Sequence, residues 1–421
     1  MKILLTAAGS YGDIAPYTGL GARLREAGHT VALATDDSYT QLVRAAGLEF
    51  RALPADPRRE ADGADGGKRD LLRRAAAFVR ALGPGVAEAA AQGTDLLLLS
   101  ATTAPLGRHV AEAMDIPSVD LHLQPNAPTG DFPPVVAGTR SLGRWGNRAA
   151  GRLSLRVVDR LYADGVRELR AQLGLPYAAP RAVRRLRGRH SRPVLHGVSP
   201  ALVPRPADWG PGLELVGNWW PYTAPDAVLP PLLEDFLASG PPPVFVGFGS
   251  MAAAGRDDGA AERLTANVVG ALRRAGVRGV VQSGWAGLNG PEGGGDVLTV
   301  GEVPHALLFP RTAAVVHHAG AGTTAAGLRA GVPAVPVPVA ADQPFWAARL
   351  AAVGAAPGPV PVPFRELAAD GTGAAAERLA DAIGRAVRDP SYREAAAAVA
   401  RRMAAEDGAG EVLKVVGGGG W

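Results

Sequence analysis

Residues Ala313–Leu350 read AAVVHHAGAGTTAAGLRAGVPAVPVPVAADQPFWAARL, and this stretch decides the fold. A short apolar run, Ala313–His318, predicts a buried strand. Four residues with almost no side chain follow at Ala319–Gly322, and Thr323–Ala330 then predicts a short helix. The Val-rich run Val332–Val339 predicts the next strand, with prolines at its ends or bulges. Strand, small-residue loop, helix and strand in this order indicate a parallel α/β sheet.

The same stretch has the features of an anion site. Small residues let a ligand approach the backbone, and the first helical turn presents unpaired N–H groups and the positive end of the helix dipole. Thr323 and Thr324 add hydroxyl donors, and His318 can donate from its ring. These features predict a diphosphate site, although Gly320 and Gly322 also fit a tight turn that binds no ligand.

A second polar cluster, Asp342 and Gln343, follows the next predicted strand. In a parallel sheet both loops emerge at the carboxyl edge, so the two clusters should lie close together. A carboxylate accepts hydrogen bonds and an amide both donates and accepts, a combination that suits sugar hydroxyls. The sequence therefore predicts a sugar site beside the phosphate site.

Length and composition limit the class of protein. A chain of 421 residues with 47% hydrophobic residues predicts two or three globular domains. There is no cysteine, which excludes disulfides and thiolate metal sites, and no long apolar run or signal peptide, so we expect a cytoplasmic protein. The net charge of +4 comes without aromatic interleaving or a binding motif, which argues against a nucleic-acid partner.

The first half alternates strands and helices. Lys2–Ala7 predicts a strand that ends in the loop Gly9–Asp13, and Pro16 is expected to start a helix. Further along, a helix over Asp70–Ala91 is expected to break at Gly83–Gly85.

The strand expected over Pro117–Leu123 carries His122 at its end, and Gln124 and Asn126 follow. A Pro-rich loop through Pro134 comes next.

The second half restarts the pattern after a Pro-rich linker. Val244–Gly247 predicts its first strand, and the motif FGSM at Phe248–Met251 its loop. Four consecutive strands of this half end in polar or glycine-rich loops at one edge, so we expect a ligand between the two domains.

Arginines recur every four residues in one segment of the first half: Arg140, Arg144, Arg148, Arg152, Arg156 and Arg160. On a helix this spacing gives a basic stripe. The stripe fits a solvated face, and it also fits weak contact with an anionic membrane surface or an acidic partner.

Four motifs carry a resemblance to a known family: GSYGD at Gly9–Asp13, FGSM at Phe248–Met251, HHAGAGTTAAG at His317–Gly327 and DQPFW at Asp342–Trp346. With them the chain resembles the GT-B glycosyltransferases of the UDP-glycosyltransferase superfamily, family 1. It is most similar to the branch of sterol glucosyltransferases and vancomycin-type antibiotic glycosyltransferases. The stretch LHLQPNAPTGDFPP at Leu121–Pro134 resembles the acceptor-side loop of that branch.

The resemblance implies an α/β fold of GT-B type, with two Rossmann-like domains whose parallel sheets face a central cleft. An acceptor-binding domain is expected over 1–222, a linker over 223–243 and a donor-binding domain over 244–395. The remaining residues, 396–421, are expected to pack back on the N-terminal domain.

The resemblance also assigns roles. Asp13 matches the proposed general base, and His122, Gln124 and Phe132 fall on the acceptor side. The residues implied to hold the nucleotide-sugar donor are Ser10, Gly12, Ser250, Trp285, Val303, His318, Gly320, Gly322, Thr323, Thr324, Asp342 and Gln343. No metal site is implied, and the sequence has no Asp-x-Asp motif.

The implied activity is an inverting, metal-independent transfer of a hexose to a hydroxyl of a hydrophobic acceptor, such as a polyketide or macrolide. The chain departs from the family pattern at Tyr11, where the branch usually has Arg, and at Ala326, where similar plant enzymes have a ribose-binding Glu. UDP- and dTDP-sugar donors therefore both stay open. The sequence also leaves open whether the protein is a monomer or a homodimer.

Three alternatives also stay open: a sterol or lipid glucosyltransferase, a nucleotide-sugar epimerase of GT-B shape, and a non-catalytic nucleotide-binding partner of another glycosyltransferase.

Overall fold

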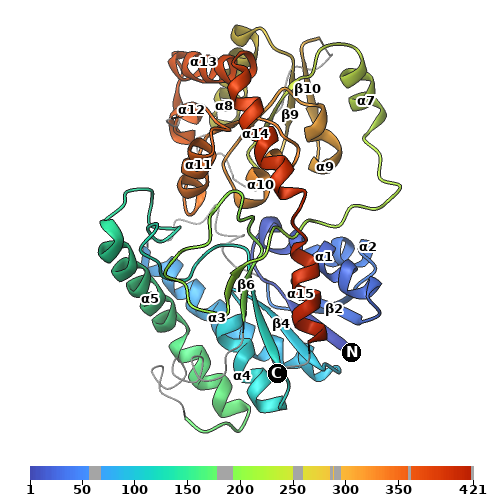
Figure 1. Ribbon diagram of the computed structural model, residues 1–421, viewed down its shortest axis with the longest axis vertical. Coiled ribbons are helices and arrows are strands. Elements are labelled where there is room, and N and C mark those ends of the chain that lie inside the picture. The colour runs from blue at the N-terminus through green and yellow to red at the C-terminus, as the bar shows by residue number, and fades with distance from the viewer. Residues whose placement is uncertain are drawn as a thin grey trace.

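Two α/β units, each built on a parallel sheet, make up the chain (Figure 1). This computed structural model describes residues 1–55, 68–177, 193–249, 259–284, 288, 295–358 and 362–418, with the backbone alone at 68–72. The predicted fold class, two α/β domains with parallel sheets, is confirmed.

The N-terminal sheet has the order β3-β2-β1-β4-β5-β6-β7 over the described residues. Its strands are β1 (Lys2–Thr6), β2 (Thr30–Thr35), β3 (Glu49–Ala52), β4 (Leu96–Ser100), β5 (Ser118–His122), β6 (Val194–His196) and β7 (Leu213–Leu215). Each neighbouring pair runs parallel. The central strands β1 and β4 are buried, which explains their uninterrupted apolar sequences ILL and LLLL.

Helices cover both faces of this sheet. They are α1 (Tyr11–Glu26), η1 (Asp37–Tyr39), α2 (Thr40–Ala45), α3 (Lys68–Ala91), α4 (Ala104–Met114) and α5 (Gly143–Gln172). Side chains of α1 and α2 form one apolar cluster with the sheet, and side chains of α3, α4 and α5 form another. None of the helices in the described ranges is long and apolar enough to cross a lipid bilayer.

The C-terminal sheet has the order β10-β9-β8-β11-β12 over the described residues. Its strands are β8 (Val244–Gly247), β9 (Gly279–Gln282), β10 (Val297–Val300), β11 (Ala314–His317) and β12 (Ala334–Pro336). The helices of this half are α7 (Pro231–Ala238), α8 (Ala260–Ala275), α9 (His305–Leu308), η3 (Phe309–Arg311), α10 (Ala321–Arg329), α11 (Gln343–Ala352), α12 (Phe364–Ala369), α13 (Ala374–Arg388) and α14 (Pro390–Met403).

In each sheet, successive strands are added first on one side of the initial strand and then on its other side. The place of this change determines where the loops of the neighbouring strands lie. In the N-terminal sheet β1 lies between β2 and β4, and in the C-terminal sheet β8 lies between β9 and β11. The loops that leave such neighbouring strands diverge at the carboxyl edge, where α/β proteins bind ligands. The Gly9–Asp13 segment follows β1, and the turn after β11 lies beside the Phe248–Gly249 loop.

An apolar cluster joins the two halves. Val198 and Leu202 of the N-terminal half are buried in it with Phe345 and Trp346 of α11. Arg349 donates from Nε and Nη2 to the Leu202 carbonyl, at 2.9 and 2.6 Å. Buried apolar area and a charge-assisted hydrogen bond thus fix how the halves meet.

The chain then returns to the N-terminal half through α15 (Gly408–Gly417). Val412 and Val416 are buried in the same apolar cluster as β1 and α1. Trp219 donates from Nε1 to the Gly408 carbonyl at 3.0 Å. In Figure 1 this helix lies against the N-terminal unit, beside α1.

Two local predictions were wrong. Helix α1 begins at Tyr11 rather than Pro16, because Ser10 and Asp13 cap its first turn. Helix α3 runs without a break through Gly83–Gly85. The predicted linker, 223–243, contains α7, whose Leu233 is buried in the C-terminal half.

Replacement of a buried side chain of α15 with a smaller one should destabilise the N-terminal half. Val412 is fully buried, so Val412→Ala removes two methyl groups and leaves a cavity. We expect a loss of about 2 kcal/mol in unfolding free energy, measured by urea denaturation. Lys414→Ala on the exposed side of the helix is the matched control, and equal midpoints for the two variants would contradict the docking of α15.

Candidate active site

The turn after β11 is held in a strained and crowded conformation. Ala319 has φ +60°, a left-handed conformation that is uncommon for a residue with a side chain. Gly320 is the N-cap of α10, and a Cβ atom there would lie 2.4 Å from Nε2 of His318. A Cβ atom at Gly249 would lie 3.0 Å from Cε1 of the same ring. Two glycines on two loops therefore make the space that the His318 ring fills.

His318 is a neutral imidazole rather than a cation. Burial lowers its pKa to about 4, and a hydrogen bond to the Gly247 backbone offsets this only in part. Burial also lowers the pKa of His305 to about 4 and that of His317 well below its usual value. Nδ1 of His317 accepts from the Ala319 N–H at 3.1 Å, so its proton lies on Nε2. The turn is thus built on uncharged imidazoles.

The first turn of α10 contains the other residues of the predicted phosphate site. Gly322 is exposed and Thr323 is half-buried. Thr324 is buried, and its hydroxyl has no hydrogen-bond partner among the described residues. Of the two threonines, Thr323 therefore has the more accessible hydroxyl.

Asp342 lies at the N-terminus of α11, after Ala341 with φ +56°. Its Oδ2 accepts from Nε1 of Trp346 at 2.7 Å and from Nε2 of Gln124 at 2.7 Å. Burial raises the pKa of the Asp342 carboxyl, the hydrogen bond from Trp346 opposes the rise, and the charge of Asp13 adds to it. Since Gln124 belongs to the N-terminal half, this carboxylate connects the predicted donor and acceptor sides.

Gln343 has a structural task. Its Oε1 accepts from the backbone N–H groups of Val339 at 2.7 Å and Ala340 at 3.0 Å. The residue is buried. Its carbonyl oxygen thus shapes the loop before Asp342.

Asp13 stands in the first turn of α1 and is exposed. Its Oδ2 accepts from the backbone N–H and the hydroxyl of Ser10, both at 2.8 Å. A Cβ atom at Gly9, where φ is +144°, would lie 2.5 Å from this oxygen. Burial raises the pKa of Asp342 and of Tyr17, and the charge of Asp13 adds to both shifts.

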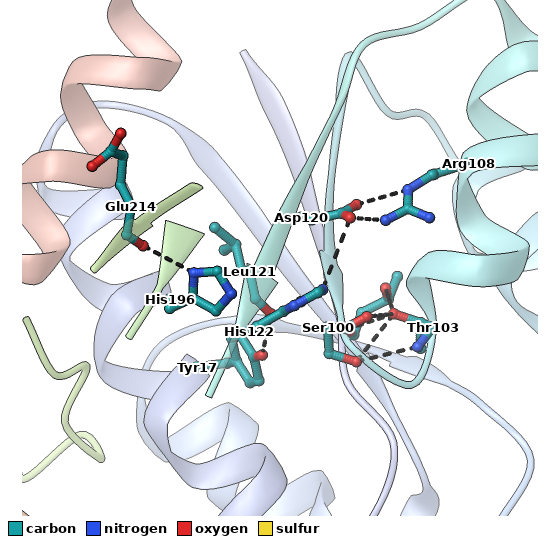
Figure 2. A network of polar contacts seen from close by, with 10 residues as sticks. Tyr17, Ser100, Thr103, Arg108, Asp120, Leu121, His122, His196 and Glu214 are labelled. Carbon is teal, nitrogen blue, oxygen red and sulfur yellow. Dashed lines mark hydrogen bonds and ion pairs between the residues drawn. The ribbon is translucent and has the colours of Figure 1, made fainter. Parts of the chain in front are cut away.

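A polar network holds the N-terminal side of the site (Figure 2). Tyr17, one helical turn after Asp13, donates to the Leu121 carbonyl at 2.7 Å. The next residue, His122, has Nε2 at 3.8 Å from Oδ2 of Asp120. The same carboxylate is held by an ion pair to Arg108, whose Nε lies at 3.1 Å from Oδ1. The structure therefore anchors His122 close to the helix that carries Asp13.

Two more side chains cross between the halves. The ring of Phe132 lies 5.3 Å from that of Phe345 in α11. Partial burial together with the charge of the Glu302 carboxylate raises the pKa of Tyr11 to about 12. Phe132, predicted on the acceptor side, thus contacts the predicted donor half directly.

The remaining predicted residues are placed as follows. Ser10 is the N-cap of α1, and Gly12 is exposed beside it. Val303 is buried in an apolar cluster, so its side chain faces the core. Ser250 and Trp285 lie outside the described residues.

The sequence interpretation missed several positioning residues. Trp346 could have been found, because it stands four residues after Asp342 and hence one helical turn above it. Glu302, Arg349 and the Asp120–Arg108 pair carry no local pattern. Glu302 and Arg349 have partners that are distant in the sequence. Arg108 and Asp120 are 12 positions apart, on helix α4 and on the strand β5 that follows it.

Comparisons with known proteins decide the family. Residues 3–125 match the Glycosyltransferase family 28 N-terminal domain, and residues 292–417 match the Erythromycin biosynthesis protein CIII-like, C-terminal domain. The O-mycaminosyltylonolide 6-deoxyallosyltransferase of Streptomyces fradiae is 38% identical over 97% of this chain and 95% of its own length. The chain belongs to the glycosyltransferases. It is a hexosyltransferase, as predicted.

Other relatives of this glycosyltransferase span both parts of the predicted branch. Sterol 3-beta-glucosyltransferase UGT80A2 of Arabidopsis thaliana is 34% identical over 98% of this chain and 65% of its own length. Among solved structures, the glycotransferase of kitacinnamycin has a TM-score of 0.70 at 20% identity, covering 99% of this chain and 98% of its own. The glycosyltransferase VinC, in complex with DTDP, has a TM-score of 0.63 at 22% identity, with the same coverage of 99% and 98%. These likenesses confirm the GT-B fold.

The buried histidines should make stability depend on pH. Because the pKa of His305 is about 4 when folded, against 6.5 in its usual range, the unfolded chain binds more protons between these values. Each neutral histidine therefore makes its full contribution to the free energy of unfolding above pH 6.5. This contribution falls as the pH drops toward 4, by about 1.4 kcal/mol per pH unit for each histidine. His305→Gln should reduce this slope, measured by urea denaturation at several pH values. An unchanged slope would show that His305 is protonated in the folded protein.

Proposed function

We propose that this glycosyltransferase moves a hexose from a UDP- or dTDP-sugar to a hydroxyl of a hydrophobic natural-product acceptor, such as a polyketide or macrolide, with inversion and without a metal ion. The observation that carries the proposal is the hydrogen bond from Gln124 of the N-terminal half to the Asp342 carboxylate of the other half, at 2.7 Å. Burial raises the pKa of Asp342, and the negative charge of Asp13, at the carboxyl edge of the N-terminal sheet, adds to this shift. Asp13 can serve the acceptor and Asp342 the donor.

The donor site of the proposal is the turn after β11. The N-terminus of α10 offers backbone N–H groups to a diphosphate, with Thr323 as a side-chain donor. The neutral His318 would become a second donor when its single N–H turns from the Gly247 backbone to the phosphate. Asp342 accepts from sugar hydroxyls, and Gln343 holds its loop. The roles of Ser10, Gly12, Ser250, Trp285 and Val303 stay predictions.

The reaction is a single displacement. Asp13 takes the proton from the acceptor hydroxyl as its oxygen bonds to the anomeric carbon. The bond between that carbon and the diphosphate oxygen breaks, and the electron pair leaves with the nucleoside diphosphate. The helix N-terminus and the donors of the turn stabilise the departing charge, so an α-linked donor gives a β-glycoside.

The acceptor side is proposed to lie in the N-terminal domain, over 1–222, with 244–395 on the donor side. Gln124 and Phe132 contact the donor half, so they are placed to sense both substrates. The natural-product class is supported by the 38% identity to the Streptomyces enzyme. A sterol or lipid acceptor is the second candidate, supported by the 34% identity to a sterol glucosyltransferase. The cytoplasmic location expected from composition stays a prediction.

Replacement of the general base separates catalysis from binding. Asp13→Asn keeps an oxygen that can accept from Ser10 but cannot take a proton. We expect turnover to fall by roughly 10²–10⁴ while calorimetry shows nucleoside diphosphate affinity close to that of the unaltered enzyme. Asp407→Asn, another aspartate that caps a helix, is the control for the loss of a cap charge. Surviving activity in Asp13→Asn would move the role of base to another group, with His122 the next candidate.

Two glycines of α10 test the diphosphate site. A Cβ atom at Gly322 or at Gly327 would meet no protein atom within 4 Å, so both alanine variants should fold. Because Cβ atoms tilt toward the helix N-terminus, Gly322→Ala would intrude on a bound diphosphate. Calorimetry with UDP and dTDP, in the absence of Mg²⁺, should show at least about tenfold weaker binding for Gly322→Ala, a difference of about 1.4 kcal/mol.

Gly327→Ala, farther along the same helix, should bind like the unaltered enzyme. No binding of either nucleotide to the unaltered enzyme would refute the donor site. Nucleotide release that needs no acceptor would favour an epimerase or a hydrolase over a transferase.

A further inference from the structure

Large apolar side chains stand in solvent along α5. Leu142 is 61% exposed, Trp145 90%, Leu153 59% and Val157 63%. With Ala149 between them, these residues recur every three or four positions, so they follow one side of the helix. The opposite side carries Asn147, Gly151, Gly165 and Leu169, which are buried.

Three arginines share this outward side: Arg152, Arg156 and Arg160. All are exposed, and within the described part of the chain none has a hydrogen bond or an ion pair. Two earlier arginines of the stripe behave differently. Arg144 pairs with Asp131 at 2.6 Å and Arg148 with Asp208 at 3.6 Å. We call Leu142, Trp145, Leu153, Val157 and the three unpaired arginines the outer face of α5.

We propose that the outer face of α5 binds the surface of an anionic lipid bilayer. Tryptophan and aliphatic side chains between arginines are typical of helices that lie in the interface of a membrane. There the apolar side chains enter the boundary of the acyl chains while the guanidinium groups stay with anionic headgroups. The row from Leu142 to Val157 is about 22 Å long at 1.5 Å per residue, enough for a peripheral contact.

The position of α5 in the fold allows this contact. The helix packs on α3 and α4 by its inner side. Figure 1 shows it along one flank of the N-terminal unit, on the outside of the molecule. A flat surface can therefore approach the outer face without displacing either sheet.

Charge distinguishes the lipid surface from other occupants. A second copy of this chain, related by twofold symmetry, would pack one positively charged face against another, and such like-charge contacts are unfavourable. A nucleic acid would satisfy the arginines but would leave the apolar row in water. A bilayer with anionic headgroups offers partners to both kinds of side chain.

Vesicle sedimentation tests the inference. We expect the full chain to sediment with phosphatidylglycerol-containing vesicles at low salt, and not with phosphatidylcholine vesicles. Arg152→Gln/Arg156→Gln/Arg160→Gln should weaken this binding about a hundredfold, since each basic residue near an anionic surface contributes about fivefold. The matched control is Arg385→Gln/Arg401→Gln/Arg402→Gln, which lowers the net charge of +4 by the same three units at exposed sites elsewhere. The control should bind like the unaltered protein.

A second measurement follows insertion itself. Vesicle lipids with brominated acyl chains should quench tryptophan fluorescence, and Trp145→Phe should lose most of that quenching. Leu153→Ser should weaken binding, whereas Leu232→Ser, at a site 67% exposed on α7, should not.

Several outcomes would overturn the inference. One is binding to phosphatidylcholine vesicles as strong as to phosphatidylglycerol-containing vesicles. Another is the same vesicle binding for the two triple arginine variants. A third is the absence of tryptophan quenching by brominated lipids. A dimer in sedimentation velocity that the α5 variants dissociate would make a second copy the occupant. Binding to a polyanion such as heparin that ignores Trp145→Phe and Leu153→Ser would reduce the face to a basic patch.

Discussion

The Asp342 carboxylate is the interaction on which the proposed site between the two halves depends. A buried carboxylate is costly unless donors surround it, and here one donor comes from its own helix and another from the other half of the chain. Trp346 and Gln124 each donate to the same oxygen at 2.7 Å. The bond from Gln124 therefore orients the acceptor-side loop against the proposed donor site. A carboxylate in water accepts more hydrogen bonds than these two. In the proposed complex, the hydroxyls of the sugar would donate the missing ones.

Sequence patterns predicted the architecture because the patterns are local. Apolar runs that end in small residues mark buried strands and their carboxyl edges, and this was enough to place both sheets and the order of motifs along them. Helix boundaries depended on contacts as well. Pro16 suggested a helix start, but the Ser10–Asp13 cap moves the start to Tyr11. The Gly83–Gly85 stretch suggested a break, yet it lets α3 approach Leu169 of α5 closely, so packing keeps the helix whole.

The candidate site was predictable at the level of loops and less so at the level of roles. The motif around Asp342 identified the loop, but the sequence gives no sign that Gln343 uses its carbonyl oxygen to hold the backbone of Val339 and Ala340. Tyr11 and Glu302 form a contact between the halves from positions far apart in the chain. Spacing rules place residues on the same edge of a sheet. They do not show which of two nearby donors will form a hydrogen bond to a carboxylate, because that depends on differences in distance of less than an ångström.

The neutrality of His318 follows from how its ring is held, and it shapes the proposed chemistry. Gly249 and Gly320 leave just enough space for the imidazole, so the ring is desolvated and its pKa falls to about 4. A desolvated cation at this point would carry a large penalty before any substrate arrived. A neutral ring avoids that penalty, while the N-terminus of α10 supplies a positive potential that does not titrate. Recognition of a diphosphate by such groups relies on fixed dipoles, which need no reorganisation as charge develops on the leaving group.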